Sequence, residues 1–192
     1  DVLVIFLAAT FLALPLGMII LRGATEVLSL PTDIWKAALR SAIVAVFSSA
    51  LSTVMALALA LRAGRLAAVS GGLPLAASSL VIGTGLFLLV YPFVNPAKLA
   101  LPITMLVNAV LALPFVLRAM APAVAKIETD FGRLAISLGM SQQTWIWGVV
   151  LPRLKGPIGF GAGLAAALSM GDLGVIALFA GDGQETLPLA MY

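Results

Sequence analysis

Long uncharged runs of apolar residues recur along the chain and predict membrane-spanning helices. A helix that crosses about 30 Å of hydrocarbon needs roughly 20 residues. The run Val2–Leu21 has no charge and 17 apolar residues of 20, and Ser41–Leu61 has 16 of 21. Three further runs meet the length requirement once glycine and proline clusters trim their ends. The five predicted spans are residues 2–21, 41–61, 73–91, 99–117 and 156–181.

The composition agrees with a protein embedded in lipid and excludes a soluble globule. Of the 192 residues, 62% are hydrophobic and only 10% are charged, and the mean hydropathy is +1.16. A soluble domain has about 25% charged residues. The sequence therefore predicts an all-α, polytopic transmembrane bundle. Because the chain begins with Asp1 and not with Met, we expect residues 1–192 to be a fragment of a longer transmembrane domain.

The residue types that the chain lacks remove most enzyme chemistry. It has no cysteine and no histidine, which excludes thiolate nucleophiles, Ser-His-Asp catalysis and nearly all zinc sites. It has no Gly-x-x-x-x-Gly-Lys-[Ser/Thr] sequence that would cradle phosphates. The net charge is only +3, so a nucleic-acid partner is not expected. We expect no catalytic residue, no metal and no cofactor, with any ATP bound by a partner subunit.

The positive charges orient the chain in the bilayer. Lys and Arg in short loops stay on the cytoplasmic side. If the first span runs outward, the inner loops hold seven Lys and Arg residues and the outer loops hold four. This orientation places the long basic loop 118–155 in the cytoplasm.

The loop 118–155 contains two predicted short helices that meet at a glycine. Apolar residues within 126–138 recur at a spacing of three and four and predict one apolar face: Ile127, Phe131, Leu134, Ala135 and Leu138. Gly139 is expected to end this helix in the left-handed conformation. Ser141 is expected to cap a second helix that ends at Pro152. No charge lies between Leu134 and Pro152, which argues against a DNA-binding helix-turn-helix.

The spacing from Gly139 through nine residues to Val149, and then to Leu151-Pro152, resembles a loop signature of ABC importers. Their membrane subunits carry Glu-Ala-Ala before the glycine and Ile-x-Leu-Pro after it, and here Arg133-Leu134-Ala135 replaces Glu-Ala-Ala. The resemblance implies that this turn is a cytoplasmic coupling helix, which docks in a groove of an ATP-binding subunit. The candidate docking residues are Arg133, Leu134, Ala135, Leu138 and Gly139. The alternative, that these residues pack on the chain's own helices or at the lipid boundary, stays open.

Three longer stretches resemble the thiamine and thiamine pyrophosphate ABC transporter permeases of Gram-negative bacteria. These stretches are Arg133–Gly139, Leu168–Phe179 and Thr186–Pro188. The permeases of that family have two similar halves, and this chain resembles the second. The resemblance implies a multi-pass inner-membrane subunit that works with ATPase subunits, a periplasmic substrate-binding protein and a second permease half or chain. Another cargo, such as ferric ion, sulfate or a polyamine, stays open, as does an ATP-independent carrier.

Asp172 is the single charge in the fifth run. A carboxylate within a span costs about 2.5–3.5 kcal/mol on insertion scales and is expected to face protein or water. Two interpretations stay open. Asp172 lines the translocation path, where its charge would suit the cationic thiazolium of thiamine, or it pairs or caps locally in a helix broken at Gly171 and Gly174.

Small residues and prolines give further expectations for packing. Small residues dominate the fifth run, a pattern that favours close helix contact in lipid: Gly159, Gly161, Gly163, Ala165, Ala166 and Ala167, with Gly159 and Gly163 four residues apart. Pro102 and Pro114 are each expected to remove a backbone hydrogen bond from the fourth span. A separate amphipathic helix is expected near Asp33–Arg40, ahead of the second span.

Overall fold

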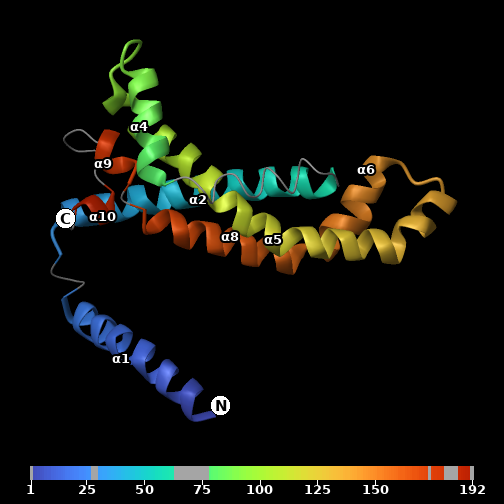
Figure 1. Ribbon diagram of the computed structural model, residues 1–192, viewed down its shortest axis with the longest axis horizontal. Helices are drawn as coiled ribbons and strands as arrows, with labels where there is room; N and C mark the ends of the chain where they lie inside the picture. Colours follow the sequence, from blue (N-terminus) through green and yellow to red (C-terminus); the bar gives the residue numbers. More distant parts are fainter. Residues whose placement is uncertain (1, 27–29, 63–77, 173, 180–185, 191–192) are drawn as a thin grey trace. The chain divides into compact units, whose positions relative to one another are not determined.

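The computed structural model describes residues 2–26, 30–62, 78–172, 174–179 and 186–190. Every regular element among these residues is a helix (Figure 1). The chain forms two compact units, residues 1–36 and 37–192. Three of the described helices are long and apolar enough to cross a membrane: α1 (Val2–Glu26), α2 (Thr32–Leu61) and α5 (Ala100–Ser137).

Helix α1 displays apolar side chains around its whole circumference. It has 25 residues and continues through Pro15. Its large side chains are exposed within this unit, from Val2 at 83% to Leu21 at 73%. A helix that is apolar on every side is stable against lipid or against other membrane helices. Helix α1 covers the whole of the predicted span 2–21 and continues to Glu26; that this segment crosses the membrane stays a prediction.

Helix α2 buries a row of small residues. The row follows a helical spacing of three and four and consists of Ala37, Ser41, Ala45, Ser48, Ser52, Ala56 and Ala60. Small side chains allow helix backbones to approach closely in a membrane. Near its start, Asp33 Oδ1 accepts a hydrogen bond from Lys36 Nζ at 2.9 Å. The expected separate helix over Asp33–Arg40 does not exist, because α2 runs without a break through these residues.

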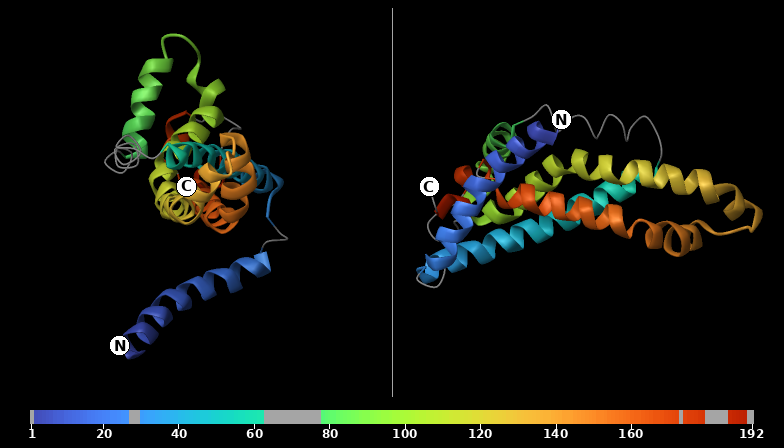
Figure 2. Two further views of the ribbon diagram at one scale, coloured as in Figure 1. Left: turned by 90° about the vertical axis from the view of Figure 1, so that its right-hand side faces the viewer. Right: turned by 90° about the horizontal axis from the view of Figure 1, so that it is seen from below.

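The main packing of the second unit joins α5 to α8 (Lys155–Met170), with α2 alongside (Figures 1 and 2). Where Gly161 of α8 faces α5, a Cβ built on this glycine would lie 2.9 Å from Val116 Cγ1. Ala165, one turn further along α8, is fully buried in the same cluster. Of the six small residues predicted for a contact face, Gly161 and Ala165 therefore face this cluster. Gly159 and Gly163 have open space beside them.

A second cluster surrounds the beginning of α5. Helices α4 (Ser79–Val90) and α9 (Ile176–Phe179) pack there, and η3 (Pro96–Leu99) leads into α5. The Phe87 and Phe179 rings meet edge to face with centroids 5.3 Å apart. The last described element, α10 (Leu187–Ala190), is tied to α2, because the Leu187 N–H donates to Ser41 Oγ at 2.7 Å.

The fourth predicted span and the loop after it are not separate elements. Helix α5 runs unbroken for 38 residues, so the predicted boundary between 99–117 and 118–155 is not a helix boundary. Helix propagation adds one hydrogen bond per residue, and no glycine occurs in α5 before Gly132. Pro102 lies in the first turn of α5, where its missing N–H would have no intrahelical partner. The expected loss of a hydrogen bond is therefore wrong at Pro102.

Two other predicted spans have different helix bounds. Within 156–181, α8 ends at Met170 and α9 follows at Ile176. Within 73–91, α4 has 12 residues, and residues 73–77 lie outside the described part of the chain. Pro152 does not end a helix, because α7 (Leu151–Arg153) includes it. The count of five spans stays a prediction.

Candidate functional site

The turn at Gly139 is a complete helix C-cap. Gly139 has φ +62°, and among the described residues no other one has a positive φ. Its N–H donates to the Ile136 carbonyl at 3.0 Å, and the Met140 N–H donates to the Ala135 carbonyl at 3.0 Å. This pair of bonds is the Schellman motif, which satisfies the last carbonyls of α5. The prediction that glycine ends this helix in the left-handed conformation is confirmed.

Ser141 starts the next helical segment, as its position predicted. Its Oγ accepts a hydrogen bond from the Thr144 N–H at 3.2 Å. The segment begins as α6 (Gln142–Trp145), widens into a π-helical turn, η4 (Ile146–Val150), and continues into α7. The turn at Gly139 is therefore held between two hydrogen-bonded helix ends.

Replacing Ser141 by alanine is expected to destabilise α6 by about 1 kcal/mol, because the Thr144 N–H loses its acceptor. Hydrogen exchange at the Thr144 amide in the full-length protein measures this loss, as exchange roughly fivefold faster. Ser137→Ala is the matched control, since Ser137 Oγ only donates to the Leu134 carbonyl, which also accepts from the Leu138 N–H. Equal exchange in both variants would contradict the capping role.

The residues predicted to dock a partner do not share one face. Leu134 and Leu138 are 55% and 67% exposed, and Arg133 and Gly139 are also exposed. Ala135 is buried and lines a cavity of about 300 Å³ between the end of α5 and α6. The expected single apolar face is therefore wrong, because Ile127 and Ala135 point inward while Leu134 and Leu138 point outward.

Two exposed apolar side chains near the turn were not predicted as site residues. Ile136 is 83% exposed and Trp147 is 73% exposed. Leu134, Ile136, Leu138 and Trp147 are the exposed large apolar side chains of the turn and its flanking helical segments, and we call them the turn surface. Exposed apolar patches are typical of contact sites. The signal that could have identified Ile136 and Trp147 as site residues is that large apolar side chains occur in a loop predicted to lie outside the membrane.

Arg153 links the helical segment after the turn to α5. Its guanidinium carbon lies 4.3 Å from the centroid of the Phe131 ring, a cation–π contact between α7 and α5. Its Nη1 also donates to the Val149 carbonyl at 3.2 Å. Such a contact contributes about 0.5–1 kcal/mol at an exposed site. The contact was not predicted, because the two residues lie 22 positions apart in the sequence.

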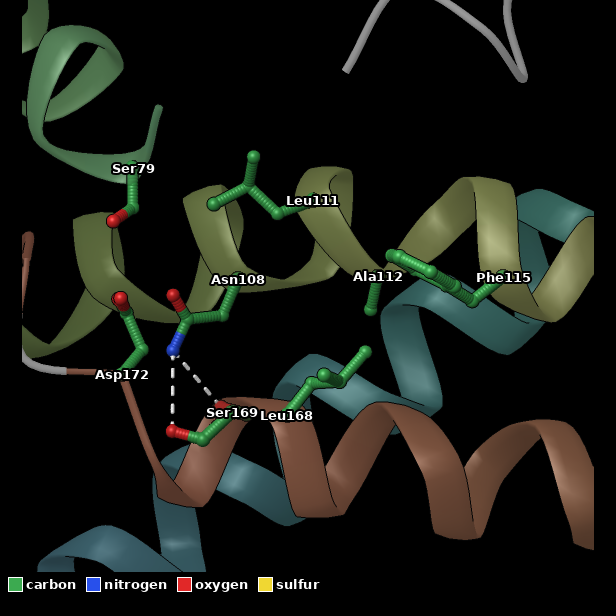
Figure 3. Close-up of a pocket in the computed structure, with 8 residues that line it drawn as sticks. All are labelled: Ser79, Asn108, Leu111, Ala112, Phe115, Leu168, Ser169 and Asp172. Carbon is green, nitrogen blue, oxygen red and sulfur yellow. Dashed lines mark hydrogen bonds between the residues drawn. The ribbon is translucent and has the colours of Figure 1, made fainter. Parts of the chain in front are cut away.

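A second candidate site is a polar cavity between α4, α5 and α8, with a volume of about 200 Å³ (Figure 3). Its polar lining consists of Ser79, Asn108, Ser169 and Asp172. Asn108 is 4% exposed, and its Nδ2 donates to Ser169 Oγ at 3.0 Å and faces the Ser169 carbonyl at 3.4 Å. This contact links α5 to the end of α8.

Asp172 lies just beyond the end of α8, not within a helix. Its Oδ1 accepts a hydrogen bond from the Gly174 N–H at 3.2 Å, so it does stabilise the turn locally. Its Oδ2 is buried and has no hydrogen-bond partner among the described residues. Figure 3 shows the carboxylate directed toward Ser79 and the cavity. Of the two open interpretations, local capping is therefore observed, and one oxygen remains available to the cavity.

The turn and the cavity are far apart on the same helix. Asn108 and the end of α5 at Ser137 are separated by about 44 Å, at 1.5 Å per residue. Asp172 lines the cavity at the Asn108 end of α5, and the predicted docking residues lie at or just beyond the other end of this helix. The sequence analysis named Asp172 as a candidate site residue but not Asn108. The signal that could have revealed Asn108 is its carboxamide within an otherwise apolar run.

No protein-family model matches the chain. Curated relatives match along its whole length. The thiamine transport system permease protein ThiP of Salmonella typhimurium is 33% identical over 100% of this chain and 38% of its own length. ThiP of Brucella abortus is 31% identical over 98% of this chain and 37% of its own length. The sulfate transport system permease protein CysW of Synechococcus elongatus is 32% identical over 41% of this chain and 28% of its own length.

These relatives, together with the apolar helices, define the class. The chain is a multi-pass membrane protein and a homologue of ABC importer permease subunits, which have no ATPase activity of their own. Within that class it is homologous along its full length to the thiamine permease ThiP. The chain spans about two fifths of the length of these relatives, 38% for the Salmonella protein.

Proposed function

We propose that this chain is the second half of a permease that carries thiamine or thiamine pyrophosphate across a bacterial inner membrane. The observation that carries the proposal is homology along the whole chain to permeases of thiamine transport systems. A periplasmic binding protein would deliver the substrate, and a second permease half would complete the path. ATP bound and hydrolysed by partner subunits would switch the cavity between outward and inward access.

The turn at Gly139 is the proposed contact with the ATPase subunits. Leu134 and Leu138 expose apolar surface there, and Arg133 adds a charge at the rim. Ala135 is buried beside the turn, and its carbonyl accepts a hydrogen bond from the Met140 N–H. Gly139 supplies the backbone conformation that presents this surface. An apolar centre with a polar rim is the usual composition of a protein interface.

Asp172 is the proposed contact with the substrate path. Its unpartnered oxygen lies in a cavity whose other polar groups are a carboxamide and two hydroxyls. A negative charge there favours a cationic cargo over an anion such as sulfate. The partial similarity to the sulfate permease CysW makes sulfate the second candidate cargo.

The test is transport by the complete assembly, meaning the full-length permease, its ATPase and its binding protein in proteoliposomes. We expect uptake of labelled thiamine that requires ATP and the ATPase subunit, and that excess sulfate does not reduce. Uptake against a gradient without the ATPase would contradict the proposal. Sulfate uptake without thiamine uptake would replace the cargo and leave the permease class intact.

A further inference from the structure

The cavity between α4, α5 and α8 presents two hydrogen-bond acceptors that nothing described in the structure uses. They are Asn108 Oδ1 and Asp172 Oδ2, both buried and without a partner among the described residues. An unsatisfied buried polar atom costs about 1–3 kcal/mol. Two of them lining one cavity point to a group that is bound there at some stage.

The orientation of Asn108 follows from its neighbours. The Ser169 carbonyl can only accept, so the Asn108 amide nitrogen must face it. This leaves the carboxamide oxygen directed into the cavity, as Figure 3 shows, on the side where the Asp172 carboxylate also points. The Asn108 side chain is 96% buried, being 4% exposed, so its direction is fixed by the contact between α5 and α8.

The chemistry of the lining selects the kind of ligand. Two acceptors, one of them a carboxylate, match a group that carries positive charge and N–H donors. No lysine or arginine lines the cavity, so an anion has no counter-charge there. Among the described residues of the lining, Asp172 is the one acidic side chain, so a divalent metal ion would find a single carboxylate ligand there.

The size of the cavity limits how much of the ligand it holds. Its volume of about 200 Å³ is below the roughly 300–1,000 Å³ of pockets that enclose a drug-sized molecule. The cavity reaches the surface of the described chain, because Phe115 and Leu168 in its lining are 36% and 43% exposed. It is therefore suited to one ring or one amino group of a larger molecule, with the Phe115 ring as an apolar wall.

We propose that Asn108 and Asp172 together form a transient recognition site for an organic cation that bears N–H donors. This inference rests on the proposed function, and it assigns selectivity to the permease itself in addition to the delivering protein. The cation is held by one charged and one neutral acceptor, brought together from α5 and the segment after α8. Release needs only a small separation of these two elements, because each supplies one acceptor.

The first experiment uses Asp172→Asn in the complete transporter. The substitution keeps an oxygen that can accept from the Gly174 N–H and removes the charge. We expect about tenfold less thiamine carried per ATP hydrolysed, with ATPase stimulation by the binding protein unchanged. Asp33→Asn, an exposed carboxylate in an ion pair with Lys36, is the matched control and should transport normally. Asp172→Glu should restore most of the transport.

The second experiment needs no transport. The chain has no cysteine, so Leu111→Cys places one thiol of this chain in the cavity lining. In the assembled transporter we expect it to react several-fold faster with a positively charged thiol reagent than with a negatively charged one. Thiamine should slow the reaction, and Asp172→Asn should abolish the charge preference. Mass spectrometry of the labelled peptide measures the rates.

The outcomes separate the site from the proposed function. If the wild-type transporter carries thiamine, but Asp172→Asn carries as much per ATP, the site is refuted and the function stands. The site is also refuted if thiamine leaves the Leu111→Cys rate unchanged. If the wild-type transporter carries no thiamine, the proposed function fails. The charge preference at Leu111→Cys and its slowing by another amine cation would then still support the site.

Discussion

Gly161→Ala is expected to destabilise the full-length protein by about 1–3 kcal/mol, although alanine is the better helix former. The added Cβ would lie 2.9 Å from Val116 Cγ1, across the contact between α8 and α5. Val116 is fully buried and β-branched, so its side chain has little freedom to move away. The helix pair must separate, and the Asn108–Ser169 contact further along the same interface weakens with it.

Two glycines on the same helix are the controls. Gly159 and Gly163 have nothing within 4 Å of an added Cβ. Alanine at either position should therefore stabilise the helix by about 0.5–1 kcal/mol, the usual gain over glycine. Thermal unfolding in detergent measures all three variants, and the sign at Gly161 must be opposite to the other two. Adding Val116→Ala should partly rescue Gly161→Ala; a lack of rescue would place the strain elsewhere.

Gly139→Val is expected to weaken binding of the ATPase subunit by about tenfold, if the turn surface is the docking site. The reason is backbone conformation and not space. Nothing lies within 4 Å of an added Cβ, but the φ of +62° costs an ordinary L-residue about 1–2 kcal/mol. A β-branched residue there would unwind the end of α5 and move Leu138 away from its present position.

Gly139→Asn is the matched variant, because asparagine tolerates the left-handed conformation. We expect it to bind the ATPase nearly as well as the wild type does. Co-purification of the ATPase with the full-length permease, at equal membrane levels, measures both. Normal binding by Gly139→Val would refute docking at this turn. An equal loss in both variants would assign the effect to the new side chain and not to the backbone.

The sequence predicted the local features well, because each depends on neighbouring residues. Gly139 ends a helix and Ser141 caps the next one, since both act on backbone groups within a few positions. The apolar runs were also predictable as long helices, because the free energy of inserting a helix into the membrane depends on each of its residues. Helices α1, α2 and α5 are the clearest cases.

The features that the sequence did not predict arise from contacts between distant segments. Asn108 meets Ser169 across 61 positions. Arg153 covers the Phe131 ring from another helix. The inward direction of Ala135 depends on α6 folding back beside α5. The glycine turn itself was predicted correctly, yet only the folded chain distinguishes the residues on its surface from those beneath it.

The unbroken course of α5 has a mechanical consequence. The cavity wall at Asn108 and the turn after Ser137 belong to one rod, so a load applied at the turn reaches the cavity without passing through a loop. Pro114 and Pro122 lie between these two ends, and each removes one hydrogen bond from the helix. The rod is therefore most compliant on that stretch, and a sideways push at its tip is expected to reach the cavity as a bend of α5 between the two prolines.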